Sequence, residues 1–159
     1  MAVRDVVQID MRIGNLVWHD RNNNGRFDGG EAGIDGVQVQ LYRAGQMPGV
    51  NAPLAVDVTS DGGIYQFINL TPGQYFVHIP QPPAAYPTSS TPTTAADNQV
   101  DNDDNGIQAN GIGQPVVSPA IQLSPGETDN TVDFGFLDPA VGNLVWNDLD
   151  ADGRVDDGE

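Results

Sequence analysis

The sequence predicts an all-β domain, and three observations support this prediction. Glycine (19 residues) and proline (12 residues) lie between short apolar runs, which is typical of many β-turns rather than of helices. No segment keeps the 3.6-residue apolar period of an amphipathic helix. Where apolar and polar residues alternate, as in 37–42, the period is two, and Val37, Val39 and Leu41 share one face.

About seven strands separated by short turns are predicted, which is the pattern of an Ig-like β-sandwich. Pro119 interrupts one of them, and a proline at that place indicates an edge strand or a bulge. The long stretch 80–115 has no strand pattern and therefore needs a functional reason or is disordered. The predicted strands are 13–18, 37–42, 54–59, 64–68, 74–79, 116–123 and 131–137.

The composition limits the classes of function. The chain carries 22 acidic and 6 basic residues, a net charge of −16, so it offers no basic surface for nucleic acid. It contains no cysteine, and all its basic residues are arginines, which excludes disulfides and lysine-based isopeptide cross-links. No apolar run approaches the ~20 residues that span a bilayer, so no membrane insertion is expected in this segment. An acidic chain of this kind is suited to binding hard cations.

An internal repeat divides the chain. Residues 13–20 recur as 141–148, so that Gly142 repeats Gly14 128 positions later. The sequence therefore predicts an N-terminal extension at 1–12, which could add a strand, and one β-sandwich module at 13–139. Residues 140–159 are then the first strand and the loop of a second, truncated repeat, as in a slice of a tandem array.

Residues 20–31 have the ligand spacing of an EF-hand calcium loop. That loop needs side-chain oxygens at positions 1, 3, 5, 9 and 12, a glycine at position 6 and a backbone carbonyl at position 7. Both copies fit, and strands rather than helices flank them, so calcium would rigidify a module and its junction. The alternative is a polar turn that binds nothing. The first copy offers Asp20, Asn22, Asn24, Gly25, Arg26, Asp28 and Glu31, and the second Asp148, Asp150, Asp152, Gly153, Asp156 and Glu159.

A second acidic cluster lies within the long stretch. Its carboxylates would repel one another unless a cation lay among them, so one or two further calcium sites are predicted there. Asp57 or Asp61, from other turns, is a candidate to share such a site. The alternative is a solvated, disordered loop. The cluster contains Asp97, Asp101, Asp103 and Asp104, with Asn102 and Asn105 beside them.

The order of these motifs resembles the SdrD B-like repeat domains of bacterial surface proteins, which are related to collagen-adhesin CNA-B modules. The resemblance covers 13–137. It is carried by Ile13-Gly14-Asn15-Leu16-Val17-Trp18 before Asp20, Gly33-Ile34-Asp35-Gly36-Val37, Thr59-Ser60-Asp61-Gly62-Gly63 to Phe67, Leu70-Thr71-Pro72-Gly73-Gln74-Tyr75, Asp101-Asn102-Asp103, and Leu123-Ser124-Pro125-Gly126-Glu127 to Phe136.

The resemblance implies a CNA-B/prealbumin-like sandwich, an extracellular location at the cell surface, and a stalk or adhesin role. It implies calcium ligands at Asp20, Asn22, Asn24, Asp28 and Glu31, and more loosely at Asp101 and Asp103. The isopeptide bonds of many CNA-B relatives are excluded here by the absence of lysine.

The expected function is that of a calcium-stabilised structural repeat, with neighbouring copies as partners in a tandem array or a head-to-tail filament. The alternative is an adhesin module that binds a host protein or a carbohydrate, for which Tyr42, Phe76 and Tyr86 could form an exposed face. An enzyme is not expected. The two histidines, His19 and His78, are expected at the surface, and the acidic clusters lack an apolar pocket.

Overall fold

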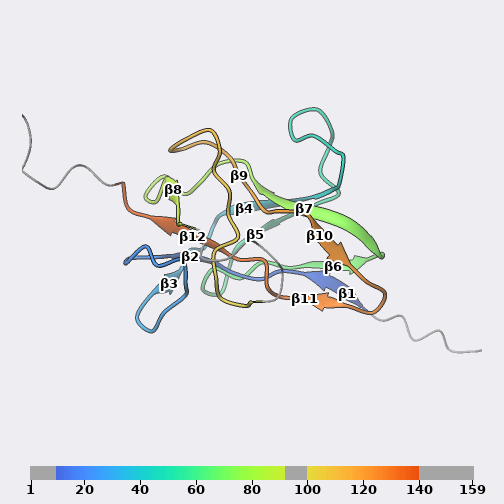
Figure 1. The fold of residues 1–159 in the computed structure, drawn as a ribbon, viewed down its shortest axis with the longest axis horizontal. Coiled ribbons are helices and arrows are strands. Elements are labelled where there is room, and N and C mark those ends of the chain that lie inside the picture. Colours follow the sequence, from blue (N-terminus) through green and yellow to red (C-terminus); the bar gives the residue numbers. More distant parts are fainter. Residues whose placement is uncertain (1–9, 92–99, 140–159) are drawn as a thin grey trace, which may run out of the picture.

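A computed structural model describes residues 10–91 and 100–139 (Figure 1). These residues form twelve short strands and no helix, so no described helix could cross a membrane. The predicted second repeat at 140–159, including its proposed ligands, lies outside the described residues. So do Asp97 and residues 1–9 of the predicted extension.

One layer of the sandwich is an antiparallel sheet around β7. Its strand order is β10-β7-β4-β5, and β9 also pairs with β7. β9 and β10 are the two halves of the predicted strand 116–123, and they separate at Pro119, as its missing N–H requires. The strands are β4 (Gln38–Arg43), β5 (Ala55–Val58), β7 (Gly73–Ile79), β9 (Val116–Val117) and β10 (Ile121–Leu123).

The other layer consists of two short sheets placed end to end. Their orders are β11-β1-β6 and β3-β2-β12-β8, and β1 and β2 lie parallel to β11 and β12. The strands are β1 (Met11–Ile13), β2 (Val17–His19), β3 (Ala32–Gly33), β6 (Phe67–Leu70), β8 (Thr88–Ser89), β11 (Thr128–Asp129) and β12 (Phe134–Leu137).

The prediction of one continuous strand at 13–18 was wrong, because the strand breaks between β1 and β2. The N–H of Leu16 donates to the Oδ1 of Asp133 at 3.0 Å instead of to a neighbouring strand. Asp133 is fully buried and lies 117 residues further along the chain, so the break has a non-local cause. β1 lies between β11 and β6, so both of its edges are already paired.

The core lies between the two layers. Val37, Val39 and Leu41 are buried, which confirms the face predicted for this strand. Burial of apolar surface at about 25 cal/mol per Å² provides most of the stability of such a core. The other buried apolar residues are Met11, Ile13, Leu16, Val17, Trp18, Tyr42, Tyr65, Phe67, Tyr75, Val77, Ile79, Val116, Ile121, Leu123, Val132, Phe134 and Phe136.

Two residues expected at the surface are buried, and both predictions were wrong. His78 is 7% exposed and Tyr42 is 2% exposed. Nδ1 of His78 and the hydroxyl of Tyr42 both contact Oε1 of Gln40, at 3.0 and 3.1 Å. Both side chains line an open cleft of about 620 Å³ together with the segment 48–53 and Pro115. Burial lowers the pKa of His78.

Candidate metal centre

The predicted calcium loop connects β2 to β3 and is fixed at both ends. β2 ends at His19 and β3 begins at Ala32, directly after the twelve loop residues. The N–H of Asp20 donates to the carbonyl of Phe136 in β12 at 2.9 Å, so the loop begins beside the last strand of the module. The loop is therefore held by three strands rather than by two helices.

Asp20 is the centre around which the loop turns. Its side chain is fully buried, and its two oxygens accept the N–H groups of Asn24 at 3.3 Å and of Gly25 at 2.8 Å. Asn23 and Gly25 have positive φ angles of 54° and 69°, a conformation that Asn and Gly adopt at low cost. This local chemistry explains why the sequence spacing alone locates the turn.

The remaining predicted side-chain ligands face one another across the loop. Asn22 and Asn24 donate to Oδ2 of Asp28 at 3.1 and 2.6 Å, with the bond from Asn24 the larger cause of the lowered pKa of Asp28. The two oxygens of Glu31 accept the N–H groups of Arg21 at 2.9 Å and of Asp28 at 3.0 Å. The structure therefore brings together the five side chains that the ligand spacing selected.

The second acidic segment packs directly on this loop. The N–H of Phe27 donates to the carbonyl of Asn102 at 2.9 Å, and the N–H of Asp104 donates to the carbonyl of Gly25 at 2.8 Å. Arg26 and Asp103 form a β-bridge between these two bonds. Two motifs that the sequence presents as separate clusters are therefore adjacent in the structure.

The expected contribution of Asp57 or Asp61 to this cluster was wrong. The carboxylate of Asp57 accepts the N–H groups of Val58 and Gln66, and Asp61 contacts the hydroxyl of Ser60. Both sit in the region of β5 and the turn at 60–63, whereas the acidic segment is bonded to the Asp20 loop. The backbone hydrogen bonds of Phe27 and Asp104 join the two motifs, and the charge of Asp20 acts on Asp104.

Asp104 is the most unusual carboxylate of this region. It is fully buried, and its Oδ1 accepts the N–H groups of Gly106 at 2.9 Å and of Gly135 at 3.0 Å. Its Oδ2 is buried and has no hydrogen-bond partner among the described residues. Burial, with smaller contributions from the charges of Asp20 and Asp103, raises the pKa of Asp104 well above its usual value. A buried acceptor without a donor is costly unless something else satisfies it.

Asp133 links the second acidic segment to the backbone between β1 and β2. It is fully buried and accepts the N–H groups of Leu16 at 3.0 Å and of Asn102 at 2.9 Å. Burial raises its pKa to about 8. Asp133 was not among the predicted site residues, although a single acidic residue within the alternating apolar run 132–136 is a signal that could have found it.

The donor set fits calcium, which takes six to eight oxygen ligands in flexible geometry. In the described ranges, no three acidic or histidine side chains already lie close enough to hold a metal by themselves. Amide and backbone oxygens would therefore have to complete each site. The Nδ2 of Asn24 faces Asp28, so its amide would turn to present the oxygen to a cation.

The raised pKa values predict an unusual pH dependence for the calcium-free protein. The folded pKa values of Asp133 and Asp104 lie above the usual carboxyl value, so the folded state binds protons more tightly than the unfolded state does. Their contribution is fully present below about pH 4 and is lost as the pH rises through about 8. The melting temperature in calcium-free buffer should therefore fall between about pH 5 and pH 8.5.

Differential scanning calorimetry over this pH range tests the prediction. Calcium should flatten the curve, because a cation replaces the protons among these carboxylates. A melting temperature that rises with pH in calcium-free buffer would contradict it.

The predicted exposed aromatic face is not formed. Tyr42 is buried and stacks on Phe76 at 5.3 Å, and Tyr86 stacks on His19 at 4.1 Å. An open hollow of about 730 Å³ is lined by 34–38 and 80–86. It contains neither histidine, and its single carboxylate is Asp35.

Comparison with known proteins agrees with this architecture. The chain is 36% identical over 151 residues to serine-aspartate repeat-containing protein F of Staphylococcus epidermidis, and 32% identical to serine-aspartate repeat-containing protein D of Staphylococcus aureus. Each alignment covers 92% of this chain but only 8% and 10% of those relatives. The family model named SdrD B-like domain matches residues 11–136, which contain β1 to β11 and most of β12. The chain belongs to the SdrD B-like domain family.

Proposed function

We propose that this chain is a calcium-stabilised structural repeat module of an extracellular surface protein. The observation that supports this proposal best is the packing of two acidic segments around Asp20, with a buried Asp104 oxygen that no described donor satisfies. A divalent cation would satisfy that oxygen and would neutralise the charge that burial disfavours.

An outer site would use the Asp20 loop alone. Its ligands would be the side-chain oxygens already gathered there and the backbone carbonyl at position 7. Glu31 could offer both oxygens, as the last residue of such loops does. The proposed ligands are Asp20, Asn22, Asn24, Arg26 through its carbonyl, Asp28 and Glu31.

An inner site would lie between the two segments. Asp104 has the free oxygen, and the charges of Asp20 and Asp103 act on Asp104 in the structure. Asp101 remains exposed and is therefore suited to the rim of such a site. Asp20 would be shared by the two sites.

The structural role follows from where the sites lie. They fix the loop beside the end of β12, and the repeated loop at 148–159 would supply Asp148, Asp150, Asp152, Asp156 and Glu159 in the next module. The relatives are far longer than this chain, which spans 8% and 10% of their length. A stalk made of such modules would be stiffened at each junction by calcium.

Calcium titration with thermal melting tests the proposed function. Extracellular modules bind calcium with Kd values of about 10⁻⁴–10⁻³ M, and a tenfold excess over Kd adds about 1.4 kcal/mol per site. One kcal/mol raises the melting temperature of a domain of this size by roughly 3–5 °C, so two sites should raise it by roughly 10 °C. The same melting temperature in millimolar calcium and in chelator would refute the proposal. Magnesium at equal concentration is the control and should have a smaller effect.

A further inference from the structure

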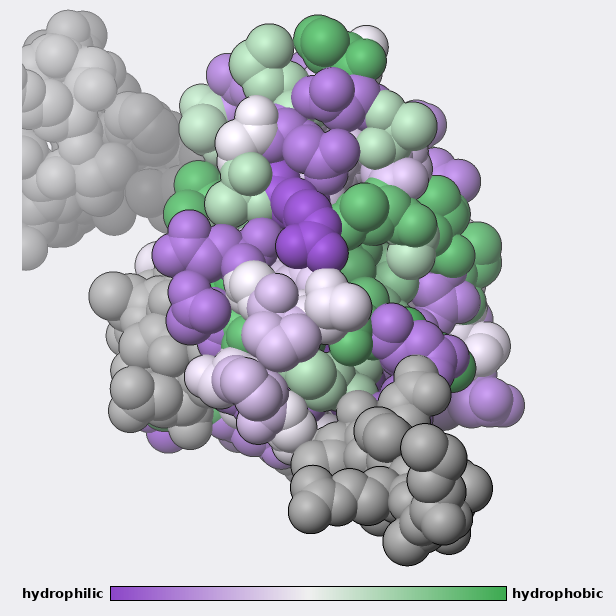
Figure 2. All heavy atoms as spheres, turned by 90° about the vertical axis from the view of Figure 1, so that its right-hand side faces the viewer, coloured by the Kyte–Doolittle hydropathy of each residue, from purple (hydrophilic) through white to green (hydrophobic). Residues whose placement is uncertain are grey.

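The described module begins and ends at opposite ends of its long axis (Figure 1). β1 begins at Met11, towards the end that faces the viewer in Figure 2, where hydrophilic and hydrophobic residues are interspersed and hydrophobic ones gather along one side. β12 ends at Leu137, beside the Asp20 loop. In a tandem array, these two different ends would meet.

The repeat shows how much chain lies between them. The same 128-position offset that relates Gly14 to Gly142 relates Asp10 to Asp138 and Met11 to Pro139. β12 ends at Leu137, so a second module whose first strand began at the position of Met11 would follow after one residue. Asp138 would then belong to both modules, and a junction of this length would leave no flexible linker.

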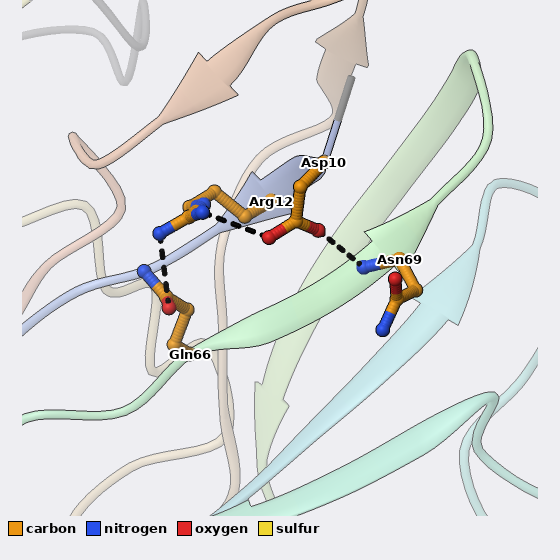
Figure 3. Close-up of polar contacts among 4 residues, drawn as sticks. All are labelled: Asp10, Arg12, Gln66 and Asn69. Carbon is orange, nitrogen blue, oxygen red and sulfur yellow. Dashed lines mark hydrogen bonds and ion pairs between the residues drawn. The ribbon is translucent and has the colours of Figure 1, made fainter. Parts of the chain in front are cut away.

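Asp10 shows what this position does at the start of a module (Figure 3). Its Oδ1 accepts the backbone N–H of Asn69 in β6 at 3.1 Å, and its Oδ2 pairs with Arg12 at 2.8 Å. Arg12 also reaches the side chain of Gln66 at 3.5 Å. The carboxylate thus ties the beginning of β1 to β6, using one oxygen for the backbone and the other for the arginine.

Asp138 shows what the same position does at the end of a module. Its Oδ2 lies 3.1 Å from Nε2 of His19, whose ring stacks on Tyr86 at 4.1 Å with an interplanar angle of 25°. The His19 side chain is 12% exposed and the Asp138 side chain 69%. An exposed pair of this kind adds little stability within one module. Among the described residues, only one oxygen of Asp138 is engaged.

The sequence of the second repeat leaves Oδ2 of Asp138 available to His19. Ala140 occupies the position of Arg12, so no arginine competes for the second oxygen of Asp138. The Oδ1 of Asp138 corresponds to the Oδ1 of Asp10. It could accept the backbone N–H at the position of Asn69 in the following module. The two roles of the carboxylate therefore use different oxygens and do not exclude each other.

We propose that Asp138 is the joint between consecutive modules, holding His19 of the module that it closes and β6 of the module that it opens. The surface formed by His19, Tyr86 and Asp138 would then take the next module of the same chain as its partner. This inference rests on the proposed role as a structural repeat and adds the residues through which repeats are aligned.

The test uses this chain extended to two full modules by a copy of residues 32–137 after Glu159. Residual dipolar couplings measured by NMR report whether the modules share one alignment. We expect one shared alignment for the unsubstituted chain, and its loss in D138A and in H19A. D10A is the matched control, because it removes the same carboxylate from the first module and should keep the shared alignment.

Further outcomes of this experiment would support or overturn the proposed joint. The double variant H19A/D138A should be no worse than D138A alone, since D138A already removes the contact that His19 makes. Independent alignment in the unsubstituted chain, or shared alignment in D138A, would overturn the proposal. Melting curves with and without calcium separate the two proposals. If calcium has no effect but D138A uncouples the modules, the joint stands and the calcium proposal fails.

Discussion

Gly33→Ala is expected to cost the module most of its stability. A Cβ on Gly33 would lie 1.7 Å from the carbonyl oxygen of Gly62, a distance that no side-chain rearrangement can relieve because both partners are backbone. A Cβ built on Gly63 would likewise lie 2.1 Å from the carbonyl oxygen of Val17. Three stretches of backbone are thus in direct contact where β3 meets the turn at 60–63.

The size of the effect follows from this geometry. Overpacking a core costs about 1–3 kcal/mol when side chains can adjust, and a backbone clash should cost more than that. The total stability of a domain is only about 5–15 kcal/mol. Because Gly33 is two residues beyond Glu31, G33A should also weaken the calcium response of the loop.

Thermal melting followed by circular dichroism measures both effects. G29A is the matched control, since a Cβ at Gly29 meets nothing within 4 Å and its φ is not positive. We expect G29A to melt close to the unsubstituted chain. G33A melting within about 2 °C of it would contradict the predicted clash.

The predictions that succeeded depend on local spacing. Alternation in 37–42 identified its buried face, and the ligand spacing of 20–31 identified side chains that the fold does bring together. Both patterns report geometry that neighbouring residues fix among themselves, such as the turn that Asp20 and Gly25 make. The order of the motifs also identified the family correctly.

The predictions that failed depend on distant residues. The strand at 13–18 is broken by Asp133, and His78 contacts Gln40 and Tyr42 of the neighbouring strand. Asp104 was one of several acidic residues in the sequence, and only its packing against Gly25 and Gly135 shows that it is buried. No local pattern reports such contacts, so the partner of the second acidic segment could not be predicted from the sequence.

Asp20→Asn is expected to abolish most of the calcium-induced stabilisation, because Asp20 would serve both proposed sites. Each site contributes about 1.4 kcal/mol at a tenfold excess of calcium over Kd, so the loss should approach 3 kcal/mol. An asparagine at this position keeps an acceptor oxygen for only one of the N–H groups of Asn24 and Gly25, because its amide nitrogen would face the other. Melting in chelator measures the cost of that lost hydrogen bond separately from the loss of the calcium effect.

Two further variants separate the sites. D28N should weaken only the outer site, since the Asp28 side chain is bonded within the loop by Asn22 and Asn24. D104N should weaken only the inner site, because Asp104 belongs to the second acidic segment and makes no side-chain hydrogen bond within the Asp20 loop. Each single variant should lose about half of what D20N loses.

D61N is the control with the same change of charge. Asp61 is exposed, is bonded only to Ser60 among the described residues, and has a φ of 53°, which asparagine tolerates well. Isothermal titration calorimetry should therefore show one calcium site fewer in D28N and in D104N than in D61N, and two sites fewer in D20N. If D20N lost no more binding than D28N, Asp20 would serve one site only. The two acidic segments would then be adjacent for packing alone, and the buried oxygen of Asp104 would need another explanation.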